Sequence, residues 1–175
     1  AVGFELYCRL LEETIRERKG EVLPELPEPV VEIPVDAYIP TGYISDEKQK
    51  VDIYKKIAAA STVDTVIQVT AEIIDRFGAP PVPVENLINI AKLKALAREL
   101  GFASITKERA EIIGKLHLGL SVDYEKILLI LQKYRTQFRY QPGRPPLFRW
   151  KGGSTAEELL RIILNSLEIL RQQAN

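Results

Sequence analysis

TVDTVIQVTAEIIDRFGAPPVPVENLINIAKLKALARELG, residues 62–101, is the stretch that decides the fold, because it predicts two helices joined by a proline-rich elbow. Apolar residues recur in its first half at spacings of three and four, which predicts one buried helix face. They are Val63, Val66, Ile67, Ile73, Ile74 and Phe77. Gly78 follows where a left-handed helix cap is expected, and Pro80, Pro81 and Pro83 prevent the helix from continuing.

The second helix of the pair is predicted to start near Pro83 and to end at Gly101. Proline suits the first turn of a helix, and Glu85 lies favourably close to the positive end of the helix dipole. The apolar residues of this helix are Leu87, Ile88, Ala91, Leu96 and Leu100. The pair is therefore a rigid support for the polar face of the first helix, which carries Gln68, Glu72, Asp75 and Arg76.

Charge and composition exclude several classes of protein. The chain has 175 residues, which is enough for one domain or for a small domain with an appendage. Lys and Arg number 24, as do Asp and Glu, so the formal net charge is +0. A module dominated by phosphate contacts would normally show a basic excess. The balance argues against such a module but leaves room for a local basic patch.

The cellular setting is predicted from the residues that are scarce. Cys8 is the single cysteine, which fits a reducing, cytoplasmic environment, and no apolar run approaches the ~20 residues of a membrane span. The chain contains no methionine, even at position 1. We therefore expect a piece of a longer cytoplasmic protein.

The remaining elements predict an α+β fold with five or six helices and a small, mostly antiparallel sheet. The candidate strands are residues 30–39, 103–106, 110–118, 138–140 and 147–151. Pro34 places the first of these near a sheet edge or leaves it only loosely paired, because proline donates no ladder hydrogen bond. We expect an N-terminal helix in residues 1–20 leading from upstream domains, a Pro/Glu connector at 21–29 and the α+β domain at 30–175.

Three helix starts carry capping signals. Asp46 with Gln49 is a variant of the capping box, Ser121 precedes a helix over about 122–135, and Ser154 with Glu157 opens a helix to about 172.

The helix after Asp46 has its lysines outside the apolar stripe. This placement is typical of a solvated face, and the alternative is a phosphate contact. These lysines are Lys48, Lys50, Lys55 and Lys56.

Catalytic motifs are absent from the sequence. It contains no GxxxxGK[ST] loop, no GxGxxG, no GxSxG, no HExxH and no CxxC. His117 is the single histidine, so a metal site of histidines or cysteines is not expected. We predict that this chain alone is not an enzyme, with no catalytic residue, no metal and no cofactor of its own.

A basic and aromatic region near the C-terminus has two interpretations. Arg139, Arg144, Arg149 and Trp150 belong to a stretch where basic and aromatic residues interleave, a pattern that favours single-stranded nucleic acid. On strands, however, the aromatic side chains would share one face and the arginines the other, as in a half-buried sheet. Both interpretations stay open at this point.

Three blocks of the sequence resemble the C-terminal (TRCF) domain of the bacterial transcription-repair coupling factors (Mfd). They are VGFELYCRLLEE at residues 2–13, VDAYIPTGYISDEKQK with IYKKIA over 35–58, and EIIDRFGAPPVPVENLINIAKLKALARELG at 72–101. The resemblance covers about the first 100 residues, and the remainder fits as a more variable continuation.

This resemblance implies a parent protein that is an ATP-dependent, double-stranded DNA translocase, with ATP and Mg in upstream motor domains. Such a parent displaces stalled RNA polymerase and recruits nucleotide excision repair through UvrA. The C-terminal domain would pack on the parent's N-terminal UvrB-like module, cover the surface that UvrA uses and so act as an autoinhibitory clamp.

The resemblance also assigns a partner-binding surface to Glu72, Asp75 and Arg76. Glu72 and Asp75 are three residues apart, so both project from one side of the helix and can accept charge-assisted hydrogen bonds from arginines of the module. Alternatively, Asp75 or Arg76 only braces the elbow at Gly78. The other hypotheses are a nucleic-acid-binding accessory domain using residues 135–151 and a purely structural tail.

Overall fold

The computed structural model describes residues 27–172, which contain five helices and a five-stranded sheet. The helix expected within residues 1–20 and the connector as far as residue 26 lie outside this range. The elements, in order, are β1 (Val30–Glu32), α2 (Glu47–Ala59), α3 (Val63–Phe77), α4 (Val82–Leu100), β2 (Phe102–Glu108), β3 (Glu111–Leu116), α5 (Tyr124–Lys133), β4 (Phe138–Gln141), β5 (Leu147–Trp150) and α6 (Ala156–Arg171). The predicted α+β class is confirmed.

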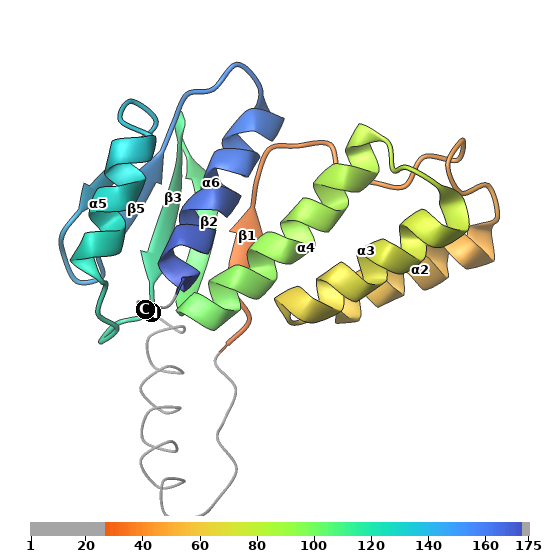
Figure 1. Ribbon diagram of the computed structural model, residues 1–175, viewed down its shortest axis with the longest axis horizontal. Helices are drawn as coiled ribbons and strands as arrows, with labels where there is room; N and C mark the ends of the chain where they lie inside the picture. The colour runs from red at the N-terminus through yellow and green to blue at the C-terminus, as the bar shows by residue number, and fades with distance from the viewer. Residues whose placement is uncertain (1–26, 173–175) are drawn as a thin grey trace, which may run out of the picture.

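The sheet and the α2–α3 pair lie on opposite sides of the long helix α4 (Figure 1). The strand order is β1-β2-β3-β5-β4, with β1 parallel to β2 and every other pair antiparallel. Helix α6 packs along α4, and α3 packs against α4 from the other side. The helix–elbow–helix of residues 62–101 therefore joins two halves of the domain.

The first predicted strand is shorter than expected. Only β1 pairs in the sheet, whereas the prediction extended to residue 39. Pro34 has no N–H for the ladder, and the Val35 N–H bonds the Ile33 carbonyl at 2.8 Å in a tight local turn. The edge position was predicted correctly. Val31, Ile33 and Val35 still turn inward, because the alternation continues after the pairing ends.

The hairpin of β2 and β3 also differs in its bounds. The prediction placed strands at 103–106 and 110–118 with a turn at 107–109, whereas β2 extends to Glu108 and pairs with Glu111 at the start of β3. The turn therefore lies at Arg109 and Ala110, and Arg109 takes a positive φ of 58°. Extra pairing at the strand ends offsets the cost of one left-handed residue.

Aromatic side chains form the core between the sheet and α6. Phe102, Phe138, Phe148 and Trp150 are fully buried, and the Phe102 and Phe148 rings meet edge to face at 5.1 Å. The Trp150 indole N–H donates to Ser166 Oγ at 3.1 Å, and Ser166 donates to the Ile162 carbonyl at 2.8 Å. These contacts fasten α6 to β5.

Two predicted caps are shifted by one or two residues. The N-cap of α5 is Asp123 rather than Ser121, and it accepts a hydrogen bond from the Glu125 N–H at 3.0 Å. The N-cap of α6 is Thr155 rather than Ser154, with the Glu158 N–H 3.1 Å from Thr155 Oγ1. Two neighbouring polar residues can each serve as an N-cap, so the sequence alone does not decide which of them caps the helix. Asp46 is the N-cap of α2, as predicted, and its Oδ1 accepts a hydrogen bond from the Gln49 N–H at 3.0 Å.

Candidate functional site

Helix α3 is capped at both ends. Thr62 and Thr65 exchange side-chain and backbone hydrogen bonds of 3.0 and 3.1 Å at its N-terminus. Gly78 ends it with a φ of 86° and a ψ of −169°, so the positive φ expected there is present but the left-handed helical ψ is not. The Tyr43 hydroxyl donates to the Gly78 carbonyl at 2.6 Å, and its ring contacts Phe77. Both ends of α3 are thus held in place by hydrogen bonds.

The elbow after α3 is held by the rest of the fold. Pro81 is the N-cap of α4 and Pro83 lies in its first turn, as predicted. Asn86, which sequence reasoning missed, is buried, and its Nδ2 donates to the Asp36 carbonyl at 3.0 Å and to Glu157 Oε1 at 3.2 Å. A polar residue inside an apolar helical stripe was its only sequence signal. Asn86 therefore ties α4 to the segment after β1 and to α6.

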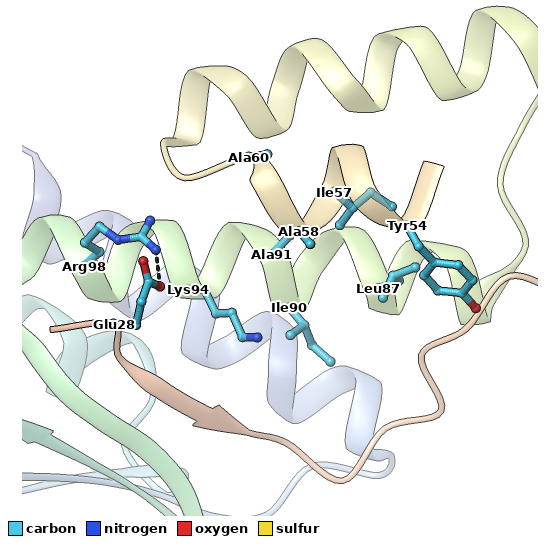
Figure 2. Close-up of a pocket in the computed structure, with 10 residues that line it drawn as sticks. All are labelled: Glu28, Tyr54, Ile57, Ala58, Ala60, Leu87, Ile90, Ala91, Lys94 and Arg98. Carbon is cyan, nitrogen blue, oxygen red and sulfur yellow. Dashed lines mark hydrogen bonds and ion pairs between the residues drawn. The ribbon is translucent and has the colours of Figure 1, made fainter. Parts of the chain in front are cut away.

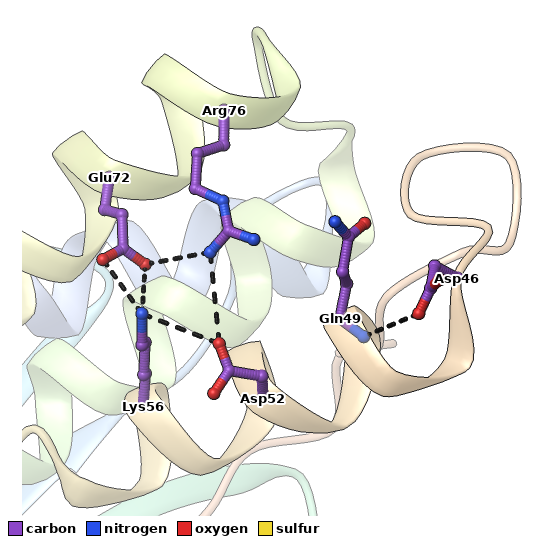
Figure 3. Close-up of polar contacts among 6 residues, drawn as sticks. All are labelled: Asp46, Gln49, Asp52, Lys56, Glu72 and Arg76. Carbon is purple, nitrogen blue, oxygen red and sulfur yellow. Dashed lines mark hydrogen bonds and ion pairs between the residues drawn. The ribbon is translucent and has the colours of Figure 1, made fainter.

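Glu72 and Arg76 of α3 form a charge network with Asp52 and Lys56 of α2 (Figure 3). The Lys56 ammonium lies 3.0 and 2.9 Å from the two Glu72 oxygens and 3.6 Å from Asp52 Oδ2. Arg76 Nη1 lies 3.4 Å from Glu72 and 4.0 Å from Asp52. Two acids and two bases thus share one half-exposed site, and none of the four carries an unbalanced charge.

Hydrogen bonding shifts the titration of this pair in opposite directions. The bond from Lys56 lowers the pKa of the Glu72 carboxyl, and the same bond raises the pKa of Lys56. Arg76 adds to the effect on the Glu72 pKa through its charge. Its guanidinium also lies 4.9 Å from the centre of the Phe77 ring. Arg76 is therefore a brace of the helix end as well as a member of the network.

Asp75 differs from Glu72 in its surroundings. The side chain is exposed, and within residues 27–172 no group forms a hydrogen bond or an ion pair with it. The structure brings Glu72 and Arg76 together and leaves Asp75 to solvent. Of the three residues assigned to the partner surface, Asp75 is the one whose carboxylate accepts no hydrogen bond from the described part of the chain.

One part of the predicted buried face is wrong. Val63, Val66 and Ile73 are buried as expected, whereas Ile67 and Ile74 are exposed. Each exposed isoleucine follows a buried residue directly and is therefore rotated by about 100° around the helix axis. The core contacts one row of side chains on α3, and the neighbouring row lies on its outer surface.

The basic and aromatic region follows the half-buried-sheet interpretation. Arg139 and Arg149 are opposite each other on β4 and β5, and both bind Glu111, with Arg139 Nη2 2.5 Å and Arg149 Nε 2.9 Å from its oxygens. The bond from Arg139, the largest cause, lowers the pKa of Glu111. Trp150 has 0% exposure, so the prediction that it contacts nucleic acid is corrected. A base needs an exposed ring on which to stack.

Arg144, the fourth residue of that prediction, is exposed in the turn between β4 and β5. It lies in sequence between the paired arginines, but within the described range it forms no ion pair. Of the three arginines assigned to the nucleic-acid contact, Arg139 and Arg149 are therefore a partly neutralised pair on the sheet and Arg144 stands apart from them. Trp150 gives them no exposed aromatic ring.

The most prominent features of the described surface are a groove and a buried histidine. A groove of about 260 Å³ lies between α2 and α4, with an apolar wall from Ile57, Leu87 and Ile90 and an ion pair of Arg98 with Glu28 at one end (Figure 2). His117 is buried, and burial lowers its pKa. In the part of the chain that the structure describes, no cluster of His, Cys, Asp or Glu is placed to hold a metal ion. No described helix combines the length and apolarity needed to cross a membrane.

Comparison with known proteins finds a matching family model and similar curated proteins. The model of the TRCF domain matches residues 33–127, which include α2, α3, α4 and the charge network. The transcription-repair-coupling factor of Staphylococcus aureus (strain USA300) is 41% identical over 121 residues, which are 68% of this chain and 10% of that protein. The factor of Bacillus subtilis (strain 168) is 41% identical over 114 residues, 65% of this chain and 9% of that protein.

A solved structure has a similar fold. The crystal structure of a C-terminal domain of transcription-repair coupling factor aligns with a TM-score of 0.63 and 24% identity, covering 82% of this chain and 94% of that one. The chain spans about a tenth of the length of the curated relatives it matches. The family model ends before β4 and β5, so the basic and aromatic region lies outside the matched residues.

Proposed function

Because the chain belongs to the TRCF-domain family of the transcription-repair-coupling factors, we propose that it is a non-catalytic regulatory domain of such a factor. In this proposal the domain contacts the N-terminal UvrB-like module of its parent through α3 and masks the surface that UvrA would use. The parent is an ATP-dependent DNA translocase that displaces stalled RNA polymerase, and ATP and Mg belong to its upstream motor domains.

The observation that carries the proposal is the contrast between Glu72 and Asp75. The network with Lys56 and Arg76 holds the Glu72 carboxylate in one position, and Asp75, three residues further along, has no partner within residues 27–172. An exposed acid on a rigid, doubly capped helix is suited to accept a bond from a basic side chain with little loss of conformational entropy.

A clamp of this kind has to hold and also release. Keeping a surface masked in 99 of 100 molecules needs about 2.7 kcal/mol, half of the ~5.5 that converts 1:99 into 99:1. One or two charge pairs within a modest interface supply a coupling of that size. Engagement of polymerase by the parent then needs to weaken only these few contacts to expose the module.

The test uses the full-length factor that carries this domain. Replacing both acids, Glu72→Ala with Asp75→Ala, is expected to increase the affinity for UvrA, measured by titration of the two purified proteins. Glu125→Ala, which removes an exposed acid from α5, is the matched control and should leave UvrA affinity unchanged. An affinity for UvrA that the double substitution does not alter would overturn the proposal.

A further inference from the structure

Arg98, in the last turn of α4, bonds two segments that lie far from each other in the sequence. Its Nη1 donates to the Ser61 carbonyl in the turn between α2 and α3. Its Nη2 donates to Glu28 Oε2, close to where the described chain begins (Figure 2). One guanidinium reaches both acceptors because its terminal nitrogens form a planar fork. Arg98 therefore joins the connector, the α2–α3 turn and α4.

The bond to Glu28 is the polar link between the end of the connector and the helices. Within residues 27–172, no other hydrogen bond or ion pair joins residues 27–29 to a helix. Val30 then enters β1, where it pairs with Ser104 of the sheet. The position of the chain at residue 28 thus affects the helices through Arg98.

The bond to Ser61 holds the turn from which α3 starts. Ser61 lies between Ala60, the C-cap of α2, and Thr62, the N-cap of α3. The Ala60 N–H donates back into α2, and the hydrogen bonds of Thr62 are made with α3. Among the described residues, the Arg98 guanidinium is therefore the hydrogen-bond donor that ties this turn to α4.

The Arg98 side chain has space to change its rotamer when it loses a partner. It lines both the groove between α2 and α4 and a second hollow of about 360 Å³ at the start of α3. The next residue, Glu99, binds Arg171 of α6 at 3.0 Å instead. The last turn of α4 thus makes two ion pairs, one with the connector and one with α6.

We propose that Arg98 is a relay that couples the position of the connector to the start of α3. While Glu28 is in place, two acceptors hold the guanidinium, and the α2–α3 turn stays against α4. When Glu28 is drawn away, Arg98 gains rotamers and its bond to Ser61 weakens. The use of the relay rests on the proposed function, in which α3 contacts the module of the parent. Movement of the upstream part of the parent then loosens α3 through residue 28.

The test measures amide hydrogen exchange by NMR in the 175-residue chain. Glu28→Ala should raise the exchange rates of the Ala60, Thr65 and Val66 amides by about two- to fivefold, the range for losing one partly exposed ion pair. Glu28 forms no bond with any of these residues, so the effect has to pass through another group. Glu32→Ala removes an exposed acid from β1 and is the matched control, which should leave the three rates unchanged.

A double-mutant cycle shows whether the effect passes through Arg98. In the Arg98→Ala background, Glu28→Ala should change the rates no further, because the relay is already removed. Arg98→Lys keeps the charge without the guanidinium fork and is a second background with the same expectation. Glu99→Gln breaks the ion pair with Arg171 and should leave the Ala60 amide unchanged. Equal effects of Glu28→Ala in all backgrounds, or no effect in the unsubstituted chain, would overturn the relay.

The full-length factor separates the relay from the proposed function. Glu28→Ala and Arg98→Ala should raise the affinity for UvrA to the same extent, and no further when combined. If exchange shows the coupling but Glu72→Ala with Asp75→Ala leaves UvrA affinity unchanged, the proposed function is overturned and the relay stands. If the two acids control UvrA affinity but Glu28→Ala alters neither exchange nor affinity, the relay is overturned and the proposed function stands.

Discussion

Lys56 of α2 and Glu72 of α3 are joined by two hydrogen bonds, at 3.0 and 2.9 Å, from one ammonium to both carboxylate oxygens. The pair spans 16 positions of the chain and closes the interhelical turn at residues 60–62. Together with the buried Val63, Val66 and Ile73, it sets the rotation of α3 about its own axis. That rotation decides which side chains of α3 face outward, Asp75 and Ile74 among them. A contact inside the domain thereby orients the surface that we assign to a partner.

The pH dependence of stability is the first prediction. The Lys56 bond lowers the folded pKa of Glu72, so its contribution is present above the unfolded value of about 4.3 and is lost as the pH falls through the folded pKa. In thermal melts at pH 7 the unsubstituted chain should be slightly more stable than Glu72→Gln, and the difference should shrink as the pH falls through the folded pKa of Glu72. The effect is small because the pair is half exposed. A difference that grows at low pH would contradict this assignment.

The same pair predicts a second loss of stability at high pH. The bond to Glu72 raises the folded pKa of Lys56, so its contribution is complete below the unfolded value of about 10.4 and is lost as the pH rises through the folded pKa. Lys56→Gln should remove this alkaline component. Lys55→Gln, on the neighbouring exposed residue, is the control and should retain it.

Gly114 gives a prediction on the core. A Cβ at this position would lie 3.0 Å from the rings of Phe102 and Trp150, which are themselves fully buried. We expect Gly114→Ala to lower the free energy of unfolding by about 1–3 kcal/mol, the range for overpacking a core. Gly42→Ala is the control, because a Cβ there would meet no atom within 4 Å. Urea unfolding measures both, and equal stability of the two variants would contradict the close packing of β3.

Several local features of the fold were predictable because they depend on neighbours in the sequence. Gly78, Pro83 and Asp46 mark helix ends through their own backbone or side-chain preferences, and the structure places all three at helix ends. One of the two interpretations of residues 138–150 placed the aromatic side chains on one face of a half-buried sheet. Phe138 and Trp150 indeed face the core, with their rings 5.5 Å apart.

Other features depend on tertiary contacts that a pattern does not contain. Periodicity grouped Ile67 and Ile74 with the buried residues of α3, since it does not show how wide a strip the core covers. Lys56 belonged to a group of lysines predicted to be solvated, and its bond to Glu72 arises only when α2 and α3 pack together. Whether Trp150 is exposed depends on which face of the sheet α6 covers. The hydrogen bond from Trp150 to Ser166 of α6 shows that α6 covers the face that carries Trp150.

Trp150 also provides a test of the nucleic-acid alternative. It is the single tryptophan of the chain, and because it is fully buried its fluorescence should be blue-shifted and not quenched by acrylamide. Addition of single-stranded DNA at low salt should leave that emission unchanged. The shared Glu111 partner of Arg139 and Arg149 gives a second reason to expect no strong phosphate binding. DNA binding that falls steeply with salt, and that Arg139→Ala weakens, would revive the alternative.

The final prediction separates the roles of the two acids on α3. Asp75→Ala should leave the melting temperature of the domain unchanged, because Asp75 has no partner within residues 27–172, and should raise the affinity of the full-length factor for UvrA. Lys56→Ala leaves Glu72 and Asp75 in place but removes the bond that orients α3. It should lower the melting temperature slightly and raise UvrA affinity less than Asp75→Ala does. If Lys56→Ala raises UvrA affinity as much as Asp75→Ala does, the orientation of α3 controls masking, and a direct contact by Asp75 is contradicted.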